Sequence, residues 1–230
     1  MPLDVGGFNI NSNIAKLFKY KDIITNGLVM YLDADSPESY PGSGTRWYDL
    51  SNNNNNGTLN GGTTYTTNGG YGVIQLNGTN STVSVPSLNL SSSNFTIIGA
   101  TRYTSTGGGR ILSGLNNNWL LGHWSNSVAN YYSEGWVTGA GVGGTDTNWR
   151  MYAGTGNLLT DTYSIYINGT LNTSNGGGAA GPNGLSIGSY APAGIEFSNA
   201  QVGFVLAYNR VLSESEITRI YDAFKFRIGL

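Results

Sequence analysis

The chain has 230 residues, a formal net charge of −2, only 10% charged residues and no cysteine. The absence of cysteine excludes disulfides, thiol catalysis and cysteine-based zinc sites, and the lack of a clustered basic face disfavours nucleic acid as a partner. With 12% aromatic residues and 35 glycines, the composition favours a rigid β-protein with many tight turns over a disordered chain.

The first 26 residues differ from the rest. Several apolar residues lie between Phe8 and Phe18, with Lys16 among them and Lys19 and Lys21 directly after them. Two interpretations remain open: an edge strand of the chain's own fold, or an extended arm that adds a strand to a sheet of a partner subunit. We expect an arm over residues 1–26, a possible docking segment, and one domain over residues 27–230.

The sequence contains no segment that predicts contact with a membrane. No apolar run approaches the roughly 20 residues needed to cross a bilayer. The first residues also lack the charged start and apolar stretch of a signal peptide.

Short β-branched and aromatic runs separated by glycine and asparagine predict a series of strands. In the first half of the chain these runs are 28–32, 47–50, 73–76, 82–85, 95–100 and 110–113. The run of asparagines at 52–56 predicts a turn, because asparagine tolerates left-handed backbone geometry.

Asp33 and Asp35 follow the first strand, separated by one residue. Carboxylate oxygens are the ligands that calcium prefers, so these two residues are weak candidates for a metal site. Aspartates at a strand end also cap turns, and that interpretation is favoured. We therefore expect no cofactor, with calcium as the open alternative.

The stretch from Trp119 to Trp149 is unusually rich in tryptophan and tyrosine. Sugars bind flat aromatic faces together with planar hydrogen-bonding groups, so this stretch holds the best candidates for a carbohydrate-binding surface. The candidates are Trp119, Trp124, Tyr131, Tyr132 and Trp136. Two alternatives stay open for each: a core position in a sandwich, or a place at a subunit interface. His123, with no partner histidine or cysteine, is interpreted as an ordinary hydrogen-bonded side chain.

Three more strands and one helix follow. The strands are predicted at 163–167, 185–188 and 200–208, with a hairpin turn at Asn168-Gly169 after the first. Ser213 and Glu216 form the S-x-x-E capping box of a helix start. Ile217, Ile220, Tyr221 and Phe224 then fall at helical spacing on one face.

The segment 208–217, Tyr-Asn-Arg-Val-Leu-Ser-Glu-Ser-Glu-Ile, resembles the end of laminin-G-like domains of the concanavalin A-like lectin/glucanase superfamily. Within that group it resembles the versions found in bacteriophage structural proteins. The segments 27–34 and 47–51 are similar to earlier parts of the same domains, and the resemblance extends from Gly27 to Arg227. It implies an all-β, two-sheet antiparallel jelly-roll sandwich with one short C-terminal helix. Strand spacing alone implies only an all-β domain.

Some laminarinase-type members of that superfamily are glycosidases with paired carboxylates on one strand, where one group attacks and another protonates the leaving oxygen. None of the five glutamates here has such partners. The segment 184–188 matches G-x-S-x-G, but no helix follows and the single histidine, His123, precedes it, so a strand is expected rather than a nucleophile elbow. No enzymatic activity is expected.

The resemblance implies a non-enzymatic virion structural protein of a bacteriophage: a capsid decoration, fibre or tail-associated subunit on the particle surface. Residues 1–26 would contact other virion proteins, the lectin-like domain would bind host or environmental glycans, and a homo-oligomer is expected. The alternative is a free carbohydrate-binding lectin or adhesin module. A glycoside hydrolase is the least favoured reading.

Overall fold

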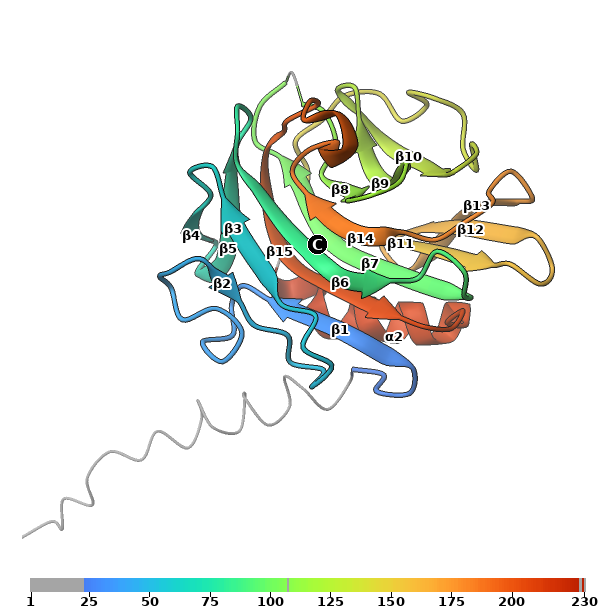
Figure 1. The fold of residues 1–230 in the computed structure, drawn as a ribbon, viewed down its shortest axis with the longest axis horizontal. Helices are drawn as coiled ribbons and strands as arrows, with labels where there is room; N and C mark the ends of the chain where they lie inside the picture. Colours follow the sequence, from blue (N-terminus) through green and yellow to red (C-terminus); the bar gives the residue numbers. More distant parts are fainter. Residues whose placement is uncertain (1–22, 107, 228, 230) are drawn as a thin grey trace, which may run out of the picture.

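The computed structural model describes residues 23–106, 108–227 and 229, and shows two antiparallel sheets packed face to face with a helix on the outside (Figure 1). The expected all-β jelly-roll sandwich with one short C-terminal helix is confirmed. Most of the expected docking arm, residues 1–22, lies outside the described residues. None of the described helices combines the length and apolar character that crossing a membrane would require.

Sheet A contains eight strands in the order β13-β12-β11-β7-β15-β5-β4, with β1 also paired to β15. Their bounds are β1 (Leu28–Asp33), β4 (Thr64–Asn68), β5 (Tyr71–Asn77), β7 (Phe95–Tyr103), β11 (Arg150–Asn157), β12 (Thr162–Ile167), β13 (Thr170–Asn175) and β15 (Asn199–Tyr208). The ten-residue β15 is central: along one side it pairs with β7, and along the other its first half pairs with β5 and its second half with β1.

Sheet B contains seven strands in the order β10-β9-β8-β14-β6-β3-β2. Their bounds are β2 (Arg46–Trp47), β3 (Gly57–Asn60), β6 (Thr82–Asn89), β8 (Leu112–Gly114), β9 (Trp119–Trp124), β10 (Ser127–Ser133) and β14 (Asn183–Ile187). The segment 184–188 therefore belongs to a strand and its exit, as expected, and not to a nucleophile elbow.

The predicted hairpin turn is confirmed, but one predicted strand end is wrong. Asn168 and Gly169 both have positive φ and connect β12 to β13 as a two-residue hairpin, which confirms the prediction. The strand predicted to end at Pro86 instead runs on to Asn89. Proline cannot donate to a ladder, and the structure accommodates it at a register irregularity in the pairing of β6 with β14.

The inner faces of the two sheets form one continuous apolar core. Trp47, Val83 and Leu121 from sheet B meet Ile97 and Ile165 from sheet A, all of them fully buried. Sheet A leaves room for side chains from sheet B: a methyl group placed on Gly99 would lie 2.7 Å from Leu112 Cδ1. Interlocking of this kind fixes the spacing of the two layers.

A second apolar core lies on the opposite, outer face of sheet A. Phe204, Leu206 and Tyr208 project there from β15, and helix α2 (Glu214–Phe224) covers them with its buried residues. Ile23, at the start of the described chain, packs in the same cluster. The predicted capping box is present, since the Ser213 side chain accepts from the Glu216 backbone N–H and the Glu216 side chain accepts from the Ser213 N–H.

A buried ion pair holds the end of this helical segment to β1. The 3₁₀ turn η2 (Lys225–Arg227) brings Arg227 to Asp33, with Nη1 to Oδ2 at 3.0 Å and Nη2 to Oδ1 at 2.5 Å. Asp33 is fully buried and also accepts a hydrogen bond from the Tyr31 hydroxyl at 2.7 Å. Both charged groups are removed from water, so the stability of this contact depends on both partners being present.

We expect Asp33→Asn to lower the free energy of unfolding by about 3–5 kcal/mol, because it leaves the Arg227 guanidinium buried without its main counter-charge. Chemical denaturation monitored by tryptophan fluorescence measures the change. The matched control is Asp222→Asn, which removes the exposed partner of Lys225 and should change the free energy of unfolding far less, because solvent screens an exposed ion pair. Equal, small effects from both variants would contradict this account of α2 and η2.

Candidate functional site

The structure divides the five candidate aromatic residues into two groups. On β9 and β10 successive side chains alternate between the core and the outer face of sheet B. Trp119 and Tyr131 face inward, with 0% of each exposed, so neither can touch a ligand. The sequence interpretation was wrong for these two, because strand aromatics at inward positions fill the sandwich.

The other three candidates come together on the outer face of sheet B, and we call Trp124, Tyr132 and Trp136 the Trp cluster. The ring centroid of Trp136 lies 5.3 Å from that of Trp124 and 5.1 Å from that of Tyr132, with interplanar angles of 59° and 75°. Trp136 is 36% exposed, and the other two are partly exposed. The two neighbours thus support the Trp136 ring and leave part of it in solvent.

A tight turn after β10 places Trp136 beside Tyr132. The Ser133 N–H donates to the Gly135 carbonyl at 2.8 Å, and the Val137 N–H donates to the Tyr131 carbonyl at 3.0 Å. A side chain at Gly135 would collide with the Gly177 carbonyl. Backbone contacts therefore fix the position of Trp136.

A polar network that the sequence did not reveal lies along the β9 and β10 ends of the same sheet. Glu134 accepts a hydrogen bond from the Asn118 backbone N–H at 2.8 Å, and the Asn118 side chain accepts one from Arg110 Nη1 at 2.7 Å. Arg110 also pairs with Glu196 at 2.6 Å, and its guanidinium carbon lies 4.0 Å from the Tyr190 ring centroid. The residues come from four distant segments, so no local pattern could have identified them.

Backbone strain gathers in the loops that carry these residues. Glu134, Glu196 and Ala129 have φ of 56°, 58° and 63°, a left-handed conformation that such side chains rarely adopt. Ser125 and Asn126, directly after Trp124, have positive φ as well. Strained residues tend to persist where the geometry serves a function, which marks this edge of sheet B as the best candidate site.

Three surface hollows of the described chain differ in their position relative to the candidate site. One of about 520 Å³ follows the Trp136 turn and is lined by Ala129, Val137, Thr138, Gly139, Val142, Gly143, Asn172, Thr173 and Asn175. One of about 530 Å³ is lined by Val29, Asn53, Asn55, Ser87, Leu88, Asn89, Leu90, Ser93 and Asn209. The first lies between the sheet edges β10 and β13 and extends the candidate site.

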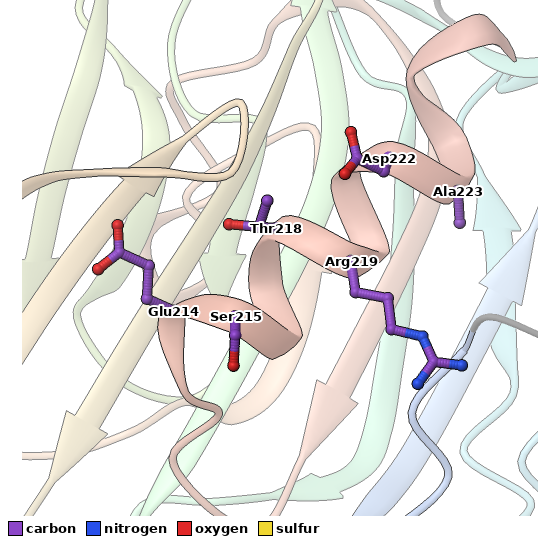
Figure 2. A pocket seen from close by; sticks show the side chains of 6 residues that line it. All are labelled: Glu214, Ser215, Thr218, Arg219, Asp222 and Ala223. Atoms are coloured by element: carbon purple, nitrogen blue, oxygen red, sulfur yellow. The ribbon is translucent and has the colours of Figure 1, made fainter.

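A third hollow, of about 700 Å³, lies on the solvent side of α2 and is formed by one helix face (Figure 2). Its lining residues are Glu214, Ser215, Thr218, Arg219, Asp222 and Ala223. The face carries charges of both signs and belongs to the helix that covers the outer core, so we assign no site to it.

Asp33 and Asp35 do not form an open cation site. Both oxygens of Asp33 contact Arg227, and Arg227 Nη2 lies 3.6 Å from Asp35 Oδ2. Asp35 Oδ1 accepts the Gly72 N–H at 2.9 Å. The two weak metal candidates are thus both in contact with the Arg227 guanidinium. Among the described residues, no three His, Cys, Asp or Glu side chains gather to hold a metal ion.

The family model described as the concanavalin A-like lectin/glucanases superfamily matches residues 77–218. A search of curated proteins gave no match.

Solved structures with the same fold include toxin, sialidase and arabinanase domains. The binding domain of Paraclostridial Mosquitocidal Protein 1 superposes with a TM-score of 0.62 and 19% identity, over 87% of this chain and 53% of that one. Trypanosoma rangeli sialidase gives 0.65 and 17%, over 88% of this chain and 33% of the sialidase. Domain 4 of AbnA, an extracellular arabinanase from Geobacillus stearothermophilus, in complex with arabinotriose, gives 0.64 and 16%, over 84% and 98%.

These likenesses establish the fold alone, because each identity is below 20%. The chain spans about half of the toxin domain and a third of the sialidase, but nearly all of the arabinanase domain.

His123 lies in the core below the candidate site, fully buried, as an ordinary histidine rather than a ligand position. Its Nδ1 is 3.4 Å from Thr101 Oγ1, and the Tyr103 and Tyr152 rings meet it edge-on. Burial, with a smaller contribution from Arg150, lowers the pKa of His123 to about 3. The unfolded chain binds a proton here near pH 6.5, whereas the folded protein does so only near its lowered pKa.

We expect the free energy of unfolding to fall as the pH drops below about 6.5, by up to about 1.4 kcal/mol per pH unit from this group. The sign follows because, between the two pKa values, the unfolded state binds more protons than the folded state. Urea melts between about pH 6.5 and 5, above the range where most carboxylates titrate, measure the slope. His123→Gln should flatten it, and identical slopes in both proteins would refute the assignment.

Proposed function

The chain belongs to the concanavalin A-like lectin/glucanase superfamily, and from that premise we propose that it is a non-enzymatic domain that binds carbohydrate at the Trp cluster. The observation that carries the proposal is the partly exposed Trp136 ring, fixed by Trp124 and Tyr132 at the strained edge of sheet B. Tryptophan combines a large apolar ring with a polar N–H, and this combination is enriched at binding surfaces.

The chemistry around Trp136 suits a polyol ligand. A sugar ring has a face of C–H groups that packs on an indole, and hydroxyls that need donors and acceptors. Glu134, which is exposed and lies two residues before Trp136, supplies a hydrogen-bond acceptor. The hollow that follows the Trp136 turn contributes the polar side chains of Thr138, Asn172 and Asn175. AbnA domain 4, which covers nearly the same length of chain, was solved with arabinotriose, and this supports the same ligand class here.

The proposal excludes catalysis on chemical grounds. Hydrolysis of a glycosidic bond needs one carboxyl group that gives up a proton and a second that attacks or activates water. In the polar network beside β10, Glu196 forms an ion pair with Arg110, and Glu134 accepts a hydrogen bond from the Asn118 N–H. Each of these two carboxylates contacts a hydrogen-bond donor of the protein rather than a second carboxylate, which supports a binding role without hydrolysis.

We further propose that the domain is displayed on a bacteriophage particle as a capsid decoration, fibre or tail-associated subunit. The support is the resemblance of segment 208–217 to phage versions of the laminin-G-like fold. A polar exterior with few charges and an apolar, lysine-bearing N-terminal segment also fit a subunit that attaches at one end. The alternative is a free lectin or adhesin module with the same glycan site.

Trp136→Ala should abolish or weaken glycan binding by about tenfold or more, because it removes the exposed ring while the core stays intact. A glycan array screened with both proteins, followed by titration of the best oligosaccharide, measures the loss. Tyr48→Ala is the matched control, since Tyr48 is 44% exposed and lies outside the Trp cluster. Binding that survives Trp136→Ala, or wild-type protein that binds no glycan, would refute the proposal.

Deletion of residues 1–22, which leaves Ile23 in the outer core, should prevent incorporation into particles without changing glycan binding, if the N-terminal segment docks the domain onto other virion proteins. Particles assembled with the full-length and the shortened chain, purified and probed for this protein, give the answer. Equal incorporation would reject the docking role, and absence of the full-length chain from particles would favour the free lectin.

A further inference from the structure

We propose that the outer face of sheet A holds a second ligand site, in which Arg102 binds the carboxylate of an acidic sugar. This site lies on the opposite sheet from the Trp cluster and shares no residue with it. The two proposals therefore stand or fall separately.

The site is built on a row of planar side chains that crosses three neighbouring strands. Gln75 on β5 pairs in register with Gln201 on β15, and Gln201 pairs in register with Arg102 on β7. The side chains repeat this order: Arg102 Nε donates to Gln201 Oε1 at 2.9 Å, and Gln201 Nε2 donates to Gln75 Oε1 at 2.9 Å. The row fixes the plane of the guanidinium.

Trp149, immediately before β11, closes the far side of the row. Its ring centroid lies 5.3 Å from the Arg102 guanidinium carbon. The indole is 7% exposed, and its Nε1 has no hydrogen-bond partner among the described residues. A stacked indole restrains the guanidinium from a second direction.

Arg102 is partly buried, and all its hydrogen-bond partners among the described residues are neutral. Four others form an ion pair with a carboxylate: Arg110, Arg150, Arg210 and Arg227. The remaining bond of Arg102 runs from Nη2 to Asn68 Oδ1 at 3.1 Å, and Nη1 has no partner among the described residues. Partial burial lowers the pKa of this guanidinium, as expected for a positive charge without a counter-ion nearby.

A pre-oriented guanidinium with free donors and no counter-charge is complementary to a planar oxyanion. The surrounding groups narrow the ligand further. Asn68 and the exposed Thr64, which pairs in register with Gln75, are uncharged hydrogen-bonding side chains. They suit hydroxyls beside one negative charge, as in a uronic acid. A polyphosphate chain would need several cations, and the row supplies only Arg102.

The test uses the full chain with ¹⁵N-labelled tryptophan, whose indole N–H signals report on each site. Trigalacturonic acid is titrated in, alongside its fully methyl-esterified form, which keeps the shape but removes the charge. Inorganic sulfate and phosphate form the third arm. We expect the Trp149 signal to shift with trigalacturonic acid and to stay in place with the methyl ester.

Arg102→Gln should weaken binding of trigalacturonic acid by about tenfold or more, because it removes a charge-assisted hydrogen bond. Arg46→Gln is the matched control: Arg46 is exposed, stacks on Tyr48 with its guanidinium carbon 5.3 Å from the ring centroid, and pairs with no described carboxylate. It should leave the affinity unchanged.

Three results would overturn the proposal: no shift of Trp149 with trigalacturonic acid, an equal shift with the methyl ester, or a shift with sulfate or phosphate only. An equal loss in Arg46→Gln would also overturn it, since that would indicate attraction by net charge. If Arg102→Gln fails to fold, the comparison of acid and ester on the wild-type protein decides. Movement of Trp136 with a neutral oligosaccharide tests the Trp cluster and has no bearing on Arg102.

Discussion

Burial of sheet A on both faces is the constraint on which the rest of the structure depends. Its inner face interlocks with sheet B, and the outward side chains in the first half of β7 and the second half of β15 form an apolar cluster. A helix must therefore return across the sheet, and α2 does so with Ile217, Ile220 and Phe224. The capping box starts that helix, and the Arg227–Asp33 pair fixes its end to β1. The cost of burying two charges is offset only while they remain together.

This arrangement decides where a ligand can bind. The inner faces are filled and α2 occupies much of the outer face of sheet A, so planar groups remain available at two places. At the β10 edge of sheet B, strained turns present Trp136 beside Glu134. Beyond α2, the row from Gln75 to Arg102 presents amides and a guanidinium. Aromatic faces and amides recognise polyols, and neither place offers a pair of carboxylates arranged for hydrolysis. Both places therefore support the proposed role in carbohydrate binding.

The sequence predicted the fold well because its signals are local. Strand periodicity, the Asn168-Gly169 hairpin and the Ser213–Glu216 box each depend on a few neighbouring residues, and each is present. The aromatic-rich stretch contains the Trp cluster that we propose as the site, but period-two alternation on β9 and β10 sends Trp119 and Tyr131 inward. The exact strand register was needed to tell these two from Trp124 and Tyr132. The networks of Arg110 and Arg102 were missed because most of their partners are distant in sequence. The positive φ of Glu134 could not be predicted either, because a glutamate rarely adopts it.

The five indole N–H signals of the native protein test the central claim most directly. Trp47 and Trp119 lie in the core, Trp149 on sheet A, and Trp124 and Trp136 at the proposed glycan site. Titration with a neutral oligosaccharide identified on a glycan array should shift the signals of Trp124 and Trp136 and leave Trp47, Trp119 and Trp149 in place. Saturable binding that leaves Trp124 and Trp136 unmoved would contradict the account.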